Sequence, residues 1–85
     1  MTFTIEYDNQ PLKFLKGLDK HILKRLIDKT ELTLSIIPVP HNAVSIVGEH
    51  GAFRIRIGDF RVLYRINYTE SKIIIFKIDK RERVY

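Results

Sequence analysis

Residues 53–66 read Phe-Arg-Ile-Arg-Ile-Gly-Asp-Phe-Arg-Val-Leu-Tyr-Arg-Ile. Apolar and polar side chains alternate for nearly the whole stretch, which is the pattern of strands with one buried face. Gly58-Asp59 is a two-residue hairpin signal, because glycine supplies the positive φ that a primed turn requires. The stretch therefore predicts a β-hairpin in which Ile57 pairs with Phe60.

That register gives the hairpin two unlike faces. Ile55 faces Val62, and Phe53 faces Tyr64, on a side that can bury against other elements. On the opposite side Arg56 lies across from Arg61. The same side also carries Arg54, across from Leu63, and Arg65.

Lys72 to Asp79 predicts a further strand, joined to the hairpin by a three-residue loop at residues 69–71. This register puts Asp79 beside Arg61. The loop length predicts core positions at Ile74, Phe76 and Ile78, and positions on the arginine side at Ile73, Ile75, Lys77 and Asp79. If the chain stays extended beyond this strand, the arginine side also gains Arg81, Arg83 and Tyr85.

The first half of the chain predicts one strand and two helices. Thr2 to Tyr7 alternates as a strand does. A short helix follows, with Asp8 or Asn9 as its cap, as far as Gly17. Asp19 caps a longer helix that Pro38 and Pro40 end. Its apolar stripe comprises Ile22, Leu23, Leu26, Ile27, Thr30, Leu34 and Ile37.

These elements predict an α+β fold, with an N-terminal strand, an antiparallel hairpin of two helices, and then an antiparallel sheet of three to four strands. At 85 residues and 10.1 kDa the chain is long enough for a single domain, residues 1–85. It has no cysteine, which excludes disulfide scaffolds, thiolate metal sites and cysteine enzymes. No apolar run is long enough to span a membrane, so we expect a cytoplasmic protein with no membrane partner.

The positive charge is concentrated in the last part of the chain. Residues 1–52 carry six basic and six acidic side chains, whereas residues 53–85 carry nine basic and four acidic ones, so the net charge of +5 lies in the latter. Arginine suits bidentate contact with phosphate. Arginines that face each other across a sheet repel, which favours a polyanion site over a merely solvated basic face.

Other chemical sites have weak support in the sequence. His21, His41 and His50 have no second ligand at metal spacing, so we expect no metal and no cofactor. The chain has no glycine-rich phosphate loop, and its serines have no plausible His and Asp partners.

The stretch Gly58-Asp-Phe-Arg-Val-Leu-Tyr64 and the closing Lys80-Arg-Glu-Arg-Val-Tyr85 resemble the RelE toxins of the RelE/ParE superfamily, in its archaeal branch. The resemblance covers almost the whole chain. It implies the toxin of a type II toxin-antitoxin pair, an endoribonuclease that cuts mRNA in the ribosomal A site and is silenced by a RelB-like antitoxin. It also implies attack by the messenger's own 2′-hydroxyl on the adjacent phosphate.

The resemblance assigns roles to individual residues. Arg54 and Arg56 stand where bacterial relatives have two lysines, and Arg61 matches the arginine that stabilises the phosphate transition state. Arg81 matches the general acid, and Tyr85 the tyrosine that stacks on the messenger. Further RNA contacts are expected from Arg65, Lys80 and Arg83. A guanidinium is a very poor proton acceptor, so the resemblance leaves the general base unidentified.

Two other functions fit the same sequence. A ParE-like toxin would inhibit DNA gyrase by binding, without chemistry of its own. A catalytically weak nucleic-acid-binding protein would keep the basic face and lose cleavage, and the replacement of lysines by arginines would be the evidence for it.

Overall fold

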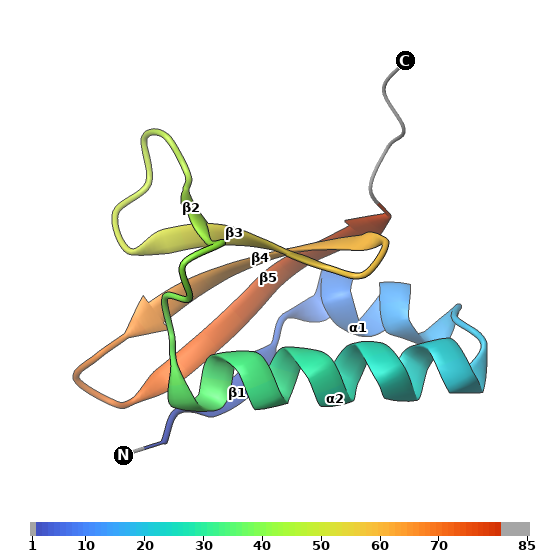
Figure 1. The fold of residues 1–85 in the computed structure, drawn as a ribbon. Coiled ribbons are helices and arrows are strands. Elements are labelled where there is room, and N and C mark those ends of the chain that lie inside the picture. Colours follow the sequence, from blue (N-terminus) through green and yellow to red (C-terminus); the bar gives the residue numbers. More distant parts are fainter. Residues whose placement is uncertain (1, 81–85) are drawn as a thin grey trace.

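The computed structural model describes residues 2–80 and has one layer of two helices against one sheet (Figure 1). Residues 1 and 81–85 lie outside the described part. The elements in chain order are β1 (Thr4–Tyr7), α1 (Asn9–Lys16), α2 (Lys20–Ile36), β2 (Val44–Ser45), β3 (Ala52–Ile57), β4 (Phe60–Asn67) and β5 (Lys72–Lys80). Both helices lie on the same side of the sheet, so its other side is left open.

The sheet has five strands in the order β1-β5-β4-β3-β2. The predicted α+β class is confirmed, but the sheet is larger and less uniform than expected. The N-terminal strand β1 joins it, parallel to β5, and the short β2 adds an edge beside β3. The sheet is therefore mixed rather than purely antiparallel.

The register of the predicted hairpin is confirmed in every pair. Ile57 pairs with Phe60, and Arg56 pairs with Arg61. Gly58 has a φ of +58°, the left-handed conformation that its place in the two-residue turn requires. Because the turn fixes the pairing, all side chains of β3 and β4 fall on the predicted sides.

Strand β5 differs from the prediction in its first half. Ile73 and Ile75 are buried in the core, and Ile74 and Phe76 lie on the arginine side, so the predicted sides of these four residues are wrong. The physical reason is a β-bulge: Tyr64 pairs with Ile75 but Leu63 pairs with Lys77, which leaves residue 76 as an extra residue. Beyond the bulge the predicted sides of Lys77, Ile78 and Asp79 are correct.

The core fills the space between the helices and the sheet. Its fully buried apolar side chains include Leu34 of α2, Ile55, Val62, Tyr64, Ile73, Ile75 and Ile78. Asp19 caps α2 as predicted, since its carboxylate accepts a hydrogen bond of 2.9 Å from the His21 amide. Asp8 stands at the N-cap of α1 without such a bond.

The two ends of the predicted stripe on α2 are more exposed than expected. Ile22, near the start of α2, is 40% exposed, and Ile37, which follows the last residue of α2 in extended backbone, is 56% exposed. No helix in residues 2–80 is both long and apolar enough to cross a membrane.

Candidate nucleic-acid interface

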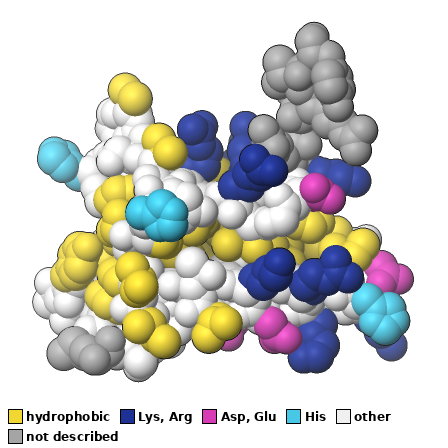
Figure 2. Space-filling model, viewed as in Figure 1, with side chains coloured by type: hydrophobic (Ala, Val, Ile, Leu, Met, Phe, Trp, Pro, Cys, Tyr) yellow, Lys and Arg dark blue, Asp and Glu magenta, His cyan; other side chains and the backbone are white. Residues whose placement is uncertain are grey.

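The open side of the sheet carries a row of arginines from its two central strands. Arg54 and Arg56 come from β3, and Arg61 and Arg65 come from β4; we call these four residues the arginine face. Figure 2 shows dark-blue side chains projecting from the side of the sheet that the helices leave open. Alternation of side chains along each strand puts them there, because their neighbours in sequence point into the core.

Arg56 and Arg61 are the centre of the arginine face, since they lie directly opposite each other on neighbouring strands. Arg56 is exposed, and its Nε is 3.4 Å from the Gly58 carbonyl oxygen. No acidic side chain within residues 2–80 pairs with Arg56. Two guanidinium groups held opposite each other repel, and an anion placed between them relieves that repulsion.

Arg61 has an acidic neighbour on the strand beyond it. Its Nε donates a hydrogen bond of 3.1 Å to Asp79 Oδ1, and the two side chains are 39% and 30% exposed. Asp79 Oδ2 is also 3.9 Å from Lys77 Nζ. The predicted approach of Asp79 to Arg61 is thus confirmed, and it leaves the terminal nitrogens of Arg61 available to another anion.

Arg65 lies at the other end of the arginine face and has two partners that the sequence did not indicate. Its Nη2 is 3.2 Å from Glu49 Oε2, and its guanidinium carbon lies 4.4 Å from the centre of the Phe76 ring. The bulge in β5 brings Phe76 to this side, so the cation-π contact could not be predicted from a regular strand. Arg54 is exposed between Val44 of β2 and Leu63 of β4.

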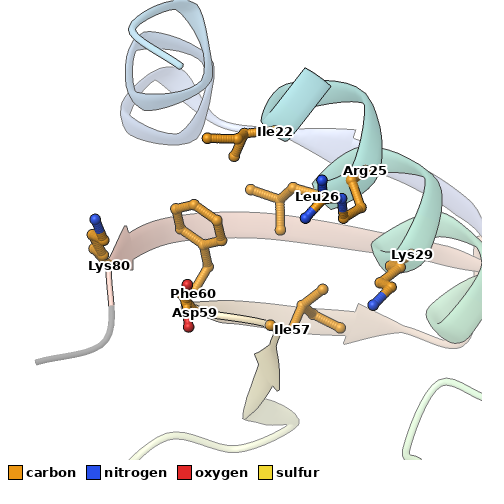
Figure 3. A pocket seen from close by; sticks show the side chains of 9 residues that line it. Ile22, Arg25, Leu26, Lys29, Ile57, Asp59, Phe60 and Lys80 are labelled. Atoms are coloured by element: carbon orange, nitrogen blue, oxygen red, sulfur yellow. The ribbon is translucent and has the colours of Figure 1, made fainter. Parts of the chain in front are cut away.

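Lys80 lies apart from the arginine face. It pairs with Phe60, whose ring points toward the helices, and it lines a cleft of about 240 Å³ between α2 and the tip of the β3-β4 hairpin (Figure 3). Ile22 and Leu26 of α2 line the same cleft. The predicted site residues Arg81, Arg83 and Tyr85 lie outside the described residues.

The chemistry available on the arginine face is electrostatic, with a carboxylate beside it. Residues 2–80 contain no group of three or more His, Asp or Glu side chains that could hold a metal ion. Guanidinium groups suit phosphate because their planar donors match two phosphate oxygens at once. The geometry fits the binding of a phosphodiester backbone.

Comparison with known proteins gives one consistent family. The family model described as "ParE toxin of type II toxin-antitoxin system, parDE" matches residues 5–85. A curated relative from Methanocaldococcus jannaschii, named "Putative toxin RelE1", is 38% identical over 88 residues, which cover 100% of this chain and 97% of the relative.

Solved structures of toxin-antitoxin complexes contain chains with the same fold as this protein. The RelE-RelB complex of Pyrococcus horikoshii contains a chain that superimposes with a TM-score of 0.80 at 29% identity, covering 99% of this chain and 100% of that one. The RelBE2 toxin-antitoxin complex of Mycobacterium tuberculosis gives a TM-score of 0.83 at 26% identity, covering 95% and 93%. From the extent of the family match and the identity to the archaeal relative, the chain belongs to the RelE/ParE family of toxins from type II toxin-antitoxin systems.

Proposed function

We propose that this toxin is a ribosome-dependent endoribonuclease that cuts mRNA in the A site and so inhibits translation. In the proposed reaction the messenger's 2′-hydroxyl attacks the adjacent phosphate, leaving a 2′,3′-cyclic phosphate and a 5′-hydroxyl. Ribosomes and messenger are the macromolecular partners, which places the protein in the cytoplasm. The proposed reaction uses no metal or other cofactor, because guanidinium groups can supply the charge stabilisation that the phosphate requires.

The observation that carries this proposal is the opposition of Arg56 and Arg61. A phosphate between them meets two guanidinium groups from adjacent strands, held by a sheet rather than by loops. Preorganised donors of this kind stabilise the extra negative charge of a pentacoordinate phosphate, and removing one typically costs about 100-fold to 1000-fold in rate. Arg54 and Arg65 extend the positive surface along the RNA, and we assign Arg81, Arg83 and Tyr85 the roles that the family resemblance gives them.

Primer extension on a reporter mRNA translated in vitro tests the proposal. The unsubstituted protein should give discrete cuts within codons only when ribosomes are present. Arg61→Ala should reduce cutting by roughly 100-fold or more. Its stability should change by less than about 1 kcal/mol, because the Arg61–Asp79 pair is partly exposed.

Arg25→Ala is the matched control, since Arg25 is an exposed arginine on α2, on the helix side of the sheet. It should cut like the unsubstituted protein. Intact mRNA with a correctly folded toxin on active ribosomes would contradict the proposal, as would equal loss of cutting in both variants.

A RelB-like antitoxin is the proposed regulatory partner. Similar chains were solved in the RelE-RelB complex of Pyrococcus horikoshii and in the toxin-antitoxin complex RelBE2 of Mycobacterium tuberculosis. An antitoxin that silences the nuclease must cover the arginine face or block its access to RNA, and charge complementarity favours an acidic segment there.

Inhibition of DNA gyrase is the second candidate, because the matching family model is described as a ParE toxin. A gyrase inhibitor of this type acts by binding and needs no reaction at a phosphate. A supercoiling assay with purified gyrase separates the two functions: the nuclease predicts undisturbed supercoiling together with cut mRNA, and the gyrase inhibitor predicts the reverse.

A further inference from the structure

We infer that Asp79 is the general base that takes the proton from the attacking 2′-hydroxyl. This inference rests on the proposed endoribonuclease function and concerns the same site. Such a step needs a proton acceptor next to the phosphate, and the guanidinium groups of Arg54, Arg56 and Arg61 cannot serve because they stay protonated. A carboxylate in contact with Arg61 supplies the missing kind of group.

The contact between Asp79 and Arg61 leaves room for RNA. Asp79 Oδ1 occupies only the Nε of Arg61, at 3.1 Å. The terminal nitrogens of a guanidinium carry four further N–H donors, and the two on the edge that faces away from Nε can hold two phosphate oxygens. One guanidinium can thus bind a carboxylate on one edge and the scissile phosphate on another, which brings the carboxylate close to the ribose 2′-hydroxyl adjacent to that phosphate.

The position of Asp79 in the sheet keeps this arrangement rigid. Asp79 pairs with Arg61 across β5 and β4, and Arg61 pairs with Arg56 across β4 and β3, so the three residues form one row across the strands. Lys77 Nζ lies 3.9 Å from Asp79 Oδ2. The carboxylate is 30% exposed, so its oxygens remain accessible to a bound substrate.

Within residues 2–80, Glu49 and Glu6 are also paired with basic side chains of the sheet, but at different places. Glu49 is held by Arg65, four residues or roughly 13 Å along β4 from Arg61. Glu6 is held by Lys72, and β1 carries it beside Ile74, five residues from Asp79 along β5. Neither is in contact with Arg61, whereas Asp79 is, so within the described residues Asp79 is the carboxylate placed for the reaction.

The step balances without any co-reactant. The 2′-hydroxyl proton moves to an oxygen of Asp79 as the O2′–P bond forms. The P–O5′ bond breaks, its electron pair stays on O5′, and that oxygen takes a proton from the general acid, which regains one from solvent. Asp79 then returns its proton to solvent, so one phosphodiester becomes a 2′,3′-cyclic phosphate and a 5′-hydroxyl.

Asp79→Asn tests the inference, because asparagine keeps an oxygen that accepts a hydrogen bond from Arg61 but cannot take up a proton. We expect single-turnover cutting on ribosomes to fall by about 100-fold or more. Binding to a short RNA should be unchanged or tighter, since a negative charge is removed from beside the arginine face. Loss of cutting together with retained binding distinguishes a base from a group that only holds Arg61 in place.

Asp59→Asn is the matched control. It makes the same chemical change two residues from Arg61, in a hairpin turn where asparagine is as well suited as aspartate. It should cut at the normal rate. If the Asp79→Asn variant cuts as fast as the unsubstituted protein, the inference about Asp79 is wrong and the proposed endoribonuclease function stands. If the unsubstituted protein does not cut, the proposed function is wrong too.

Discussion

Thr30 is a buried polar side chain in the middle of α2, facing the sheet between Leu26 and Leu34. It is 1% exposed, and its hydroxyl has no hydrogen-bond partner in the described part of the protein. An unpaired buried hydroxyl costs free energy, and valine has nearly the same shape without it. Thr30→Val should therefore raise the free energy of unfolding by about 1 kcal/mol, measured by urea denaturation.

Thr33→Val on the same helix is the control for the change in side-chain type, because Thr33 is only partly buried. Its stability should stay within about 0.5 kcal/mol of the unsubstituted protein. A loss of stability in Thr30→Val alone would mean that the Thr30 hydroxyl is hydrogen-bonded in solution.

The residues of the arginine face could be predicted because two local rules determine them. Alternation decides that Arg54, Arg56, Arg61 and Arg65 share one side, and the turn at Gly58 decides which of them meet. The contact of Arg65 with Glu49 depends on the path of the loop between β2 and β3, which no local rule determines. For that reason the sequence indicated the centre of the site and missed the partners at its end.

In β5, two departures from the predicted structure, one in the loop and one in the strand, compensate each other. The loop before it has four residues, 68–71, because Asn67 pairs with Lys72, whereas three were predicted. The bulge at residue 76 adds one residue to β5 and restores the predicted register, so Arg61 still pairs with Asp79. Between the loop and the bulge, the side chains lie on the opposite sides of the sheet from those predicted. Residues 73, 74 and 75 are all isoleucine, so no alternation of polar and apolar side chains indicates which of them face the core.

Gln10 ties the end of β5 to α1 in a way that resembles one more strand. Its side-chain nitrogen donates to the Ile78 carbonyl at 3.0 Å, and its side-chain oxygen accepts from the Ile78 amide at 2.9 Å. Strand β1 ends at Tyr7, opposite Ile75, so the Gln10 amide continues the pairing of β5 where β1 has stopped. Ile78 directly precedes Asp79, which makes this contact important for the site.

Gln10→Met keeps the length of the side chain and removes both hydrogen bonds. Hydrogen exchange at the Ile78 amide should accelerate by about five- to tenfold, which corresponds to roughly 1 kcal/mol. The amide of Val62, on the central strand β4, should be affected less. Equal acceleration at both amides would show that Gln10 stabilises the whole fold and does not act on β5 locally.

Two tyrosine hydroxyls link the sheet to the helical layer. Tyr7 of β1 donates to Glu31 of α2 at 2.9 Å, and Tyr64 of β4 donates to the Pro38 carbonyl, just after α2, at 2.6 Å. Removal from water raises the pKa of both phenols, and Glu31 raises the pKa of Tyr7 further. Both hydroxyl groups must therefore stay protonated to donate these two hydrogen bonds.

The stability of the protein should accordingly fall in alkaline solution. Burial, and to a smaller extent Tyr68, raises the pKa of Tyr64 to about 12, whereas the unfolded chain has a tyrosine pKa near 10. Below pH 10 Tyr64 is protonated in both the folded and the unfolded state, so its full contribution to the free energy of unfolding is present. Between about pH 10 and 12 the unfolded state loses its proton first, so the free energy of unfolding decreases, by up to about 1.4 kcal/mol per pH unit for this group.

Tyr64→Phe separates this effect from the titration of lysines. At pH 9 the variant should be less stable by about 1 to 2 kcal/mol, because the Pro38 carbonyl loses its donor. As the pH rises to 11.5 the difference should narrow, since only the unsubstituted protein still has this phenol to titrate. Urea denaturation at both pH values measures the change. A constant difference between Tyr64→Phe and the unsubstituted protein would mean that Tyr64 titrates alike in the folded and unfolded states, so that its buried hydroxyl contributes a hydrogen bond but no pH dependence.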